Sequence, residues 1–569
     1  MKFLRRGIFF FATAALLIWW LLPTAGPQVQ RGSVLALQLS GSYVEAAAPS
    51  FLARVFGEER QPFISVLSEL AKAERDDRIS GVALRIRRLD IGWAMAQELR
   101  DAIAGLRAAG KGTVALLETG ALGANLEYYV ASAADEVLLS SGTSGPLVGL
   151  GMEFFFFGGL WEKLGVDPEV VVVGEYKSAV EVLAGTGMSP AYREMAESLL
   201  DSIWGEFVTG IAEGRGLEPR AVREAIDSSP VTAEELETFG LVDGTDSFEG
   251  AVSRLGKVRI DGSDYQAVDP AEVGFAPVAQ FALVYGSGTV VMGEGLQSPT
   301  GGQRFSSDSV SRALIDAADD PSIDAIVFRV DSPGGSPLAS EIIWHAAERA
   351  KSRGKPLVAS VSNVAASGGY YVLAGADAVV ASAGSLVGSI GVYMIRPQIG
   401  GLLDKLGIGV ASLTRGRDAE ILVSSRPLTA SGRARLEQEV QEVYDLFVTR
   451  VSEGRGLSPA RVDAVGRGRV WTGAQGIERG LVDELGGLHA AVRVAKRELG
   501  LAEDADVALI PHPAPRSLSE EVLEVLQGSV VRAALPPGWS PLVERLQTLT
   551  AALAQGAPAL VPPLVLRIR

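Results

Sequence analysis

The chain lacks cysteine altogether and contains only three histidines. The missing thiols exclude thiol catalysis, structural disulfides and cysteine-ligated zinc, and we expect neither a metal nor a cofactor. A conventional pair of serine and histidine would have to use His345, His489 or His512. His345 falls on an expected helix, and the other two lie beyond the repeated core or in the C-terminal tail, so none is a convincing base for a serine.

Basic charge is also scarce. The 52 lysines and arginines face 68 acidic residues, which gives a net charge of -16 and a pI near 4.9. No basic stripe suited to phosphates is present, and this argues against nucleic acid as a partner. Hydrophobic residues make up 47% of the 569 residues, which predicts two or three folded domains rather than disorder.

The first residues contain an apolar run from Ile8 to Leu22 that follows three basic residues. This order of charge keeps the N-terminus in the cytoplasm and sends the following chain across the membrane. The run is shorter than the roughly 20 residues that usually span a bilayer, so a cleaved signal peptide is an alternative. We favour an uncleaved anchor, because Trp19 and Trp20 suit an interface. Either way, we expect the main body outside the cytoplasm.

Five short sequences recur in the same order at a slowly drifting offset of about 240 residues. The pairs begin at Gly110 and Gly354 (GK), Tyr128 and Tyr370 (YYV), Lys163 and Lys405 (KLG), Glu213 and Glu453 (EGRGL), and Gly240 and Gly480 (GLVD). We interpret them as the duplication of one domain. The expected organisation is an anchor (1–26), a first repeat (27–257), a linker (258–279), a second repeat (280–500) and a tail of unknown role (501–569).

Each repeat alternates strand-like and helix-like segments, which predicts an α/β fold. In the second repeat, the apolar runs Ala325–Asp331 and Pro356–Ser362 flank a helical pattern over Leu338–Arg353. Strand, helix and strand in this order predict a parallel sheet whose ligands bind at the carboxyl ends of the strands. The sequences DSPGG and AASGG both follow such strands.

The two repeats differ at the positions that carry chemistry. Aligned on the YYV match, Ser367 of the second repeat corresponds to Asn125 of the first. Aligned on the KLG match, Lys177 of the first repeat corresponds to Ala419 of the second. Each repeat therefore lacks what the other retains, and one site built from Ser367 and Lys177 explains both losses.

A serine needs a base within hydrogen-bond reach, and a lysine can be that base only when its amine is neutral. Burial must then lower the lysine pKa well below about 10.4. The four valines Val170–Val173 predict a buried strand that leads to Lys177. For the oxyanion, backbone amides are available at Gly368, directly after the serine, and in the glycine turn Ser332–Gly335.

These motifs, with GSLVGSIGV and GEYKSAVE, resemble the signal peptide peptidase A proteins of peptidase family S49 in their long, tandem form. The resemblance runs from about residue 30 to 500. It implies a ClpP/crotonase-like fold, a bacterial inner-membrane location and a tetramer around an apolar chamber. It also implies Ser367 as nucleophile, Lys177 as base, Ser389 as the residue that orients the lysine, and Gly335 and Gly368 as oxyanion-hole positions.

The resemblance implies that the substrates are cleaved signal peptides and similar apolar peptides. This chain has Asp331 before SPGG, a position where asparagine is also common in the family. The run Phe154–Phe157 fits either the lining of an apolar chamber or plain core packing. Two rival functions stay open at this point. One is a crotonase-type acyl-CoA enzyme, which uses similar paired amides, and the other is a catalytically dead scaffold tethered to the membrane.

Overall fold

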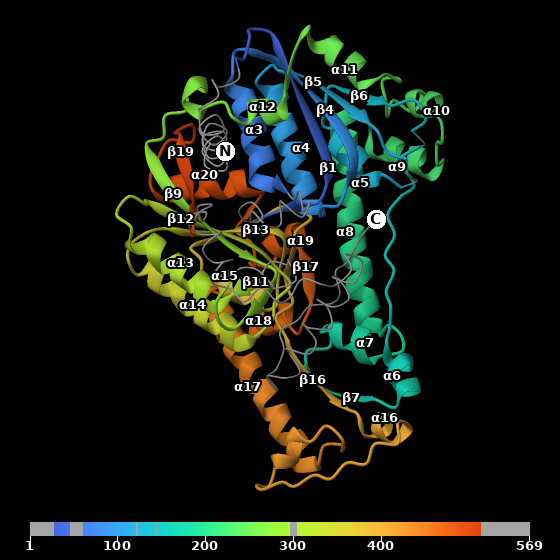
Figure 1. Ribbon diagram of the computed structural model, residues 1–569, viewed down its shortest axis with the longest axis vertical. Helices are drawn as coiled ribbons and strands as arrows, with labels where there is room; N and C mark the ends of the chain where they lie inside the picture. The colour runs from blue at the N-terminus through green and yellow to red at the C-terminus, as the bar shows by residue number, and fades with distance from the viewer. Residues whose placement is uncertain (1–27, 46–60, 121–122, 144, 296–303, 514–569) are drawn as a thin grey trace, which may run out of the picture.

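The computed structural model describes residues 28–45, 61–120, 123–143, 145–295 and 304–513 (Figure 1). The predicted anchor (1–26) and the last part of the predicted tail (514–569) lie outside these described residues. Within the described ranges, no helix is both long enough and apolar enough to cross a membrane.

The first repeat is built on a parallel five-stranded sheet. Its order is β6-β5-β4-β1-β8, with bounds β1 Ser33–Gly41, β4 Ile79–Leu89, β5 Gly112–Leu117, β6 Glu136–Leu139 and β8 Val258–Asp261. Apolar side chains are buried on both faces of this sheet, as parallel strands require. The covering helices are α3 Phe63–Arg75, α4 Trp93–Ala108, α5 Asn125–Ala131, α8 Pro190–Arg215, α9 Pro219–Asp227 and α11 Phe248–Leu255.

The second repeat carries a larger sheet. Its path is β17-β15-β13-β12-β9-β19, and β14 pairs with both β13 and β18. All its pairs are parallel except β15 with β17. The strands are β9 Ala279–Ser287, β12 Ala325–Ser332, β13 Leu357–Ala366, β14 Ala378–Ala381, β15 Leu386–Gly388, β17 Val470–Thr472, β18 Glu484–Leu485 and β19 Val507–His512.

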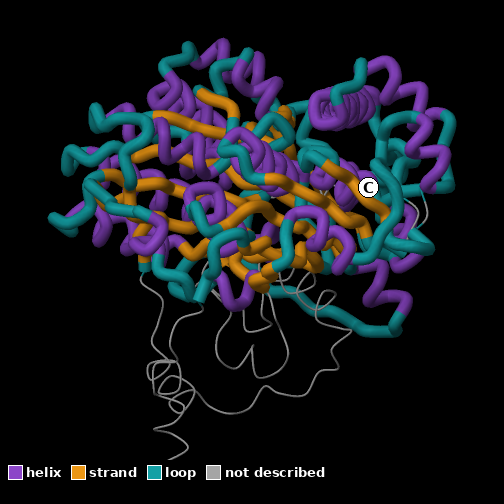
Figure 2. Tube along the Cα trace, turned by 90° about the horizontal axis from the view of Figure 1, so that it is seen from above, coloured by secondary structure: helices purple, strands orange, loops and turns teal. Residues whose placement is uncertain are grey.

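Helices lie on either side of the strands (Figure 2). In the second repeat they are α13 Ser307–Asp319, α14 Pro337–Lys351, α15 Gly368–Leu373, α17 Ala430–Arg455 and α20 Leu488–Glu498. The predicted strand, helix and strand over residues 325–362 are confirmed as β12, α14 and β13. Their apolar pattern was strong because both faces of the central strands are buried.

Sheet strands extend across two of the predicted domain boundaries. Residues 258–279 were expected to form a linker, but they begin with β8, which pairs with β1 in the first sheet. Residues 501–569 were expected to be a tail, but β19 adds to the second sheet beside β9. Both strands are short and lie at the edge of a sheet. Because each has only one neighbouring strand, its sequence shows little of the apolar pattern that marks a central strand.

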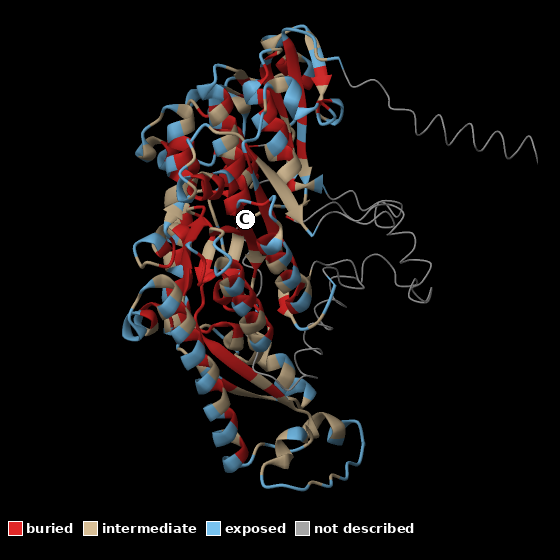
Figure 3. Cartoon of the chain, turned by 90° about the vertical axis from the view of Figure 1, so that its left-hand side faces the viewer, coloured by how far each residue is buried: buried red, intermediate tan, exposed pale blue. Residues whose placement is uncertain are grey.

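The two repeats also share a two-stranded antiparallel ribbon. We call this ribbon, together with its two flanking helices, the arm. It pairs β7 (Asp167–Val173) of the first repeat with β16 (Val392–Gln398) of the second, beside α6 (Gly158–Leu164) and α16 (Gly400–Lys405). The arm projects at the bottom of Figure 1, and it is largely exposed or half-buried in Figure 3. The valine run was expected to be a buried strand, but only Val171 is buried and Val172 is exposed, because a two-stranded ribbon leaves one face uncovered.

A buried cluster of charges joins the repeats above the arm. Arg329 of β12 donates hydrogen bonds to Glu45, which follows β2 (Tyr43–Val44), and to Glu98 of α4, at distances of 2.6–3.0 Å. It also donates to Ser360 Oγ at 3.0 Å, and the three charged side chains are at most 6% exposed. Because each carboxylate faces the same guanidinium, the cluster fixes how the first repeat sits on the second.

We expect Arg329→Leu to destabilise the chain by about 3–5 kcal/mol, because it leaves two buried carboxylates without their cation. Urea unfolding followed by circular dichroism measures the loss. Arg353→Leu is the matched control. Its ion pair with Asp319 is about half exposed, so its loss should cost less than about 1 kcal/mol. Equal effects of the two changes would contradict a structural role for the cluster.

Candidate active site

Ser367 occupies the turn between β13 and α15. Its backbone has φ 55° and ψ -122°, a conformation that residues other than glycine rarely adopt. The turn is held from both sides, since the Ser367 N–H donates to Gly388 O at 2.8 Å and the Ser367 carbonyl accepts from the N–H groups of Tyr370 and Tyr371. This local strain places the hydroxyl at the carboxyl end of β13, where the parallel sheet was expected to carry its chemistry.

Lys177 reaches this turn from the first repeat. It lies just after β7, in a loop that packs against the segment around Gly468 of the second repeat. A Cβ atom at Gly468 would lie 2.5 Å from the Lys177 nitrogen, so a side chain there would push the loop away. Tyr176 N–H also donates to Arg467 O at 3.0 Å. The arm and this close contact therefore deliver the lysine to the other repeat.

Three groups surround the Lys177 amine. Nζ lies 2.8 Å from Ser367 Oγ, 2.9 Å from Ser389 Oγ and 2.9 Å from the Ser389 carbonyl oxygen. All three side chains are buried, with Lys177 2% exposed and both serines 0%. A neutral amine has two hydrogens and one lone pair. It can therefore donate to both oxygens of Ser389 and accept the proton of Ser367.

Burial lowers the pKa of Lys177 to about 7, because a charged amine loses its hydration there. Within the described part of the chain, no carboxylate forms an ion pair with it. An acidic neighbour would favour the ammonium form, so an apolar setting with only neutral partners is what a lysine base needs. The arrangement can therefore abstract a proton from a serine near neutral pH.

Gly335 and Gly368 lie next to each other beside the serine. A Cβ atom at Gly368 would lie 3.1 Å from the Gly335 nitrogen. Gly335 forms a bridge with Val290, and a Cβ atom there would lie 2.1 Å from the Val290 oxygen. Among the described residues, neither glycine N–H has a hydrogen-bond acceptor. Two unpaired amides next to a nucleophile fit an oxyanion hole.

The structure does not support a histidine as the base, nor a second active site in the first repeat. His345 is exposed and contacts Glu341 at 3.0 Å, and no contact of a histidine with Ser367 exists in the described ranges. Asn125, the counterpart of Ser367, is 2% exposed, and both its amide nitrogen and its amide oxygen have a hydrogen-bond partner. Its amide donates to Gly149 O at 2.9 Å and accepts from Val148 N–H at 3.1 Å. The first repeat thus has a satisfied structural residue at that position.

Two supporting residues were missed by sequence reasoning. Gly468 admits the lysine loop, and nothing in its local sequence distinguishes it from other glycines. Ser332 was noted only as part of the SPGG turn, yet its hydroxyl donates to Gly288 O at 2.7 Å and accepts from Gly334 N–H at 3.1 Å. It thereby shapes the turn that presents Gly335.

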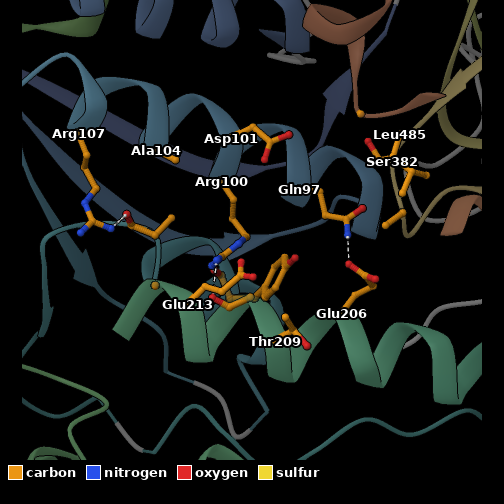
Figure 4. Close-up of a pocket in the computed structure, with 16 residues that line it drawn as sticks. Gln97, Arg100, Asp101, Ala104, Arg107, Glu206, Thr209, Glu213, Ser382 and Leu485 are labelled. Atoms are coloured by element: carbon orange, nitrogen blue, oxygen red, sulfur yellow. Dashed lines mark hydrogen bonds between the residues drawn. The ribbon is translucent and has the colours of Figure 1, made fainter. Parts of the chain in front are cut away.

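A separate cavity of about 450 Å³ lies between the repeats and is shown in Figure 4. Its walls come mainly from α4 and α8 and include Arg100, Asp101, Glu206 and Glu213. None of the predicted site residues lines it. The cavity is therefore a distinct feature of the interface and not the place where Lys177 meets Ser367.

The pattern of peptidase family S49 matches this chain twice, over residues 106–259 and 349–502. The duplication read from the sequence is thus confirmed. Lys177 lies in the first matched segment, and Ser367, Gly368 and Ser389 lie in the second. Gly335 precedes the second segment.

Several curated proteins are similar over most of the chain. The chloroplastic serine protease SPPA of Arabidopsis thaliana is 30% identical, covering 89% of this chain and 75% of its own. Protease 4 of Haemophilus influenzae is 31% identical, covering 78% and 74%. Protease 4 of Salmonella typhi is 27% identical, covering 92% and 88%. A solved ClpP1 mutant from Listeria monocytogenes matches 37% of this chain and 94% of its own at 13% identity, with a TM-score of 0.23 that supports no argument.

The change Lys177→Met replaces the amine with an apolar group of similar length. We expect peptide hydrolysis to fall by about 10²–10⁴-fold, because the proton acceptor is lost. The fold should persist, since the amine is buried without a counter-charge. Lys163→Met, in the exposed end of α6, is the matched control. Hydrolysis that survives in Lys177→Met would exclude this lysine as the base.

The pH dependence follows from the lowered pKa. Below about 7 the Lys177 amine is protonated and cannot accept the proton of Ser367, so activity should rise with pH and level off above that value. Measurement of kcat/KM between pH 5 and 9 checks this. A lysine with its ordinary pKa would instead give activity that still rises towards pH 10.

Proposed function

The chain belongs to peptidase family S49 and is a serine protease, and from this premise we propose that it hydrolyses apolar peptides such as cleaved signal peptides with Ser367 and Lys177. The observation that carries the proposal is the 2.8 Å contact between Lys177 Nζ and Ser367 Oγ inside a dry site. A hydroxyl and a neutral amine at this distance form a nucleophile with its base.

Acylation begins when Lys177 Nζ accepts the proton of Ser367 as Oγ attacks the carbonyl carbon of the scissile bond. The carbonyl oxygen becomes an oxyanion, which accepts hydrogen bonds from the Gly335 and Gly368 amides. Ser389 positions the amine through its hydroxyl and its carbonyl. The resulting lysine ammonium is the acid for the next step.

The tetrahedral intermediate collapses as the ammonium of Lys177 donates its proton to the leaving nitrogen. The C–N bond breaks, the amine product departs and the acyl group remains on Ser367 Oγ. A water molecule then attacks the ester carbonyl while Lys177 accepts its proton. The same lysine returns that proton to Oγ, which releases the carboxylic acid and restores the serine.

The preference for apolar peptides has two supports. One similar protein, from Enterococcus faecium, is named a putative signal peptide peptidase and is 32% identical over 191 residues. A cavity of about 420 Å³ is lined by Met152, Phe154, Phe156 and Met188, with residues of α8. The opposite face of α8 reaches β17 through Met195, whose sulfur accepts the Val470 N–H. An apolar hollow thus lies on the helix that packs beside the site.

The location and assembly belong to the same proposal. The basic residues and apolar run of segment 1–26 support a single-pass anchor that holds the catalytic body outside the cytoplasm. The arm and the loop after it expose a set of large apolar side chains, namely Leu406, Ile408, Val410, Leu413 and Leu422. Apolar exposure on this scale supports contact with further copies of the chain, as in a tetramer.

A serine-reactive fluorophosphonate probe tests the proposal. We expect it to label the wild-type protein and Ser382→Ala, whose hydroxyl is buried elsewhere, but not Ser367→Ala. The wild-type protein, before labelling, should also cleave a synthetic signal peptide and show no binding of coenzyme A. Probe attached to another residue would exclude Ser367, and labelling without peptide cleavage would exclude the substrate class.

A further inference from the structure

The strand that leads to Ser367 contains an irregularity. β12 and β13 pair in regular parallel register as far as Val330 with Val361, and pairing resumes at Ser332 with Ala365. The residues Ser362–Val364 therefore bulge opposite the single residue Asp331. The matching strands of the first repeat, β4 and β5, pair without a shift until β5 ends. The bulge belongs to the repeat that carries the serine, and bulges commonly re-aim a side chain near an active site.

Each residue of the bulge is held by a different partner. Ser362 Oγ donates to Glu45, and the Ser362 carbonyl accepts from Ser385 Oγ at 2.6 Å. Asn363 lies against the start of α4, where a Cβ atom at Gly92 would come within 2.1 Å of its oxygen. Val364 N–H donates to a carboxylate oxygen of Asp331 at 3.0 Å. Contacts from both repeats thus hold the bulge in one conformation.

Asp331 also lies directly before the oxyanion turn. Its carbonyl accepts from Gly288 N–H at 2.9 Å, and the next residues, Ser332–Gly335, form the turn that presents the Gly335 amide. Its side chain accepts from Val364 of β13, the strand that ends directly before Ser367. One residue therefore joins the segment that carries the oxyanion amide to the segment that carries the nucleophile.

We propose that Asp331 is a positioning residue for the reaction: its carboxylate holds the bulge of β13 and so sets Ser367 in register with the Gly335 amide. The proposal rests on the proposed roles of Ser367, Lys177 and Gly335. Loss of the carboxylate leaves a half-buried Val364 N–H without its acceptor and frees the bulge to relax, which moves the serine relative to the oxyanion turn. Misplacement of about 1 Å at such a site costs catalysis heavily.

The surroundings of Asp331 make this bond sensitive to pH. Burial, and then the negative charge of Glu45, raise the pKa of Asp331 to about 7, against the Val364 amide, the Arg329 charge and Asn363, which lower it. Arg329 is shared with Glu45 and Glu98. An ionised carboxylate accepts a stronger hydrogen bond than a protonated one. Activity should therefore require a neutral Lys177 and an ionised Asp331, and fall steeply below pH 7.

Two variants test the proposal. Asp331→Asn keeps an oxygen that can accept from Val364 but cannot titrate. Because its neutral amide oxygen accepts more weakly than an ionised carboxylate, we expect its kcat at pH 9 to fall by about threefold to tenfold. The acid limb of log kcat against pH should become less steep, with a slope near one, because only Lys177 still titrates. Asp331→Ala removes the acceptor, and kcat should fall about tenfold or more with little change in KM. Labelling of Ser367 by the fluorophosphonate probe should slow in parallel.

The matched control is Asp324→Asn, at the other end of β12. Asp324 is exposed and accepts a neighbouring strand amide, Gln280 N–H, at 2.8 Å, and this change should alter neither kcat nor the pH profile. If Asp331→Ala does not fold, the dependence of kcat on pH in Asp331→Asn tests the proposal instead. Wild-type kcat in Asp331→Ala, or an unchanged acid limb in Asp331→Asn, would overturn the proposal. Ser367→Ala, assayed alongside, shows separately whether the proposed function itself fails.

Discussion

The buried contact between the Lys177 amine and the Ser367 hydroxyl is the constraint on which the site depends. A lysine in water is charged and useless as a base, so the amine must be kept dry and without an acidic partner. The structure meets both conditions by enclosing Nζ between Ser367 and Ser389. The proposed base therefore depends on every element that closes this enclosure, including Gly468, which admits the lysine loop.

The enclosure exists only where the two repeats meet. The first repeat contributes the lysine through β7, and the second contributes both serines and Gly468. The relative position of the two sheets is fixed by the arm on one side and by the cluster of Glu45, Glu98 and Arg329 on the other. Buried charges of this kind add little net stability compared with apolar packing. They do enforce one arrangement, because any shift would leave a carboxylate unpaired.

Much of this architecture could be predicted from the sequence, and the reasons are specific. Strong apolar runs marked β12 and β13 because both faces of those strands are buried. The complementary losses at Asn125 and Ala419 paired Lys177 with Ser367 without any knowledge of the fold. Gly368 and the turn Ser332–Gly335 were candidate oxyanion donors from the residues alone. The choice of Gly335 within that turn and the role of Ser389 needed the family resemblance, since glycine turns and turn serines are common.

The rest depends on contacts between residues far apart in the chain. The edge strands β8 and β19 have one neighbour each, so their sequences carry little pattern. The exposure of Val172 depends on its place in a two-stranded ribbon, and the role of Gly468 depends on a backbone nearly 300 residues upstream. The bulge opposite Asp331 is likewise a matter of register between strands, and a single sequence does not reveal register.

The division of the site between the repeats has a consequence for biosynthesis. A nascent chain that has left the ribosome only as far as the first repeat contains Lys177 but not Ser367, Ser389 or Gly468. Its lysine is hydrated and keeps an ordinary charge, and it has no hydroxyl to activate. The protease is therefore inert throughout the synthesis of its first half. Translation of its own second half supplies the missing groups, so the pair of Lys177 and Ser367 can form only after that half has been made.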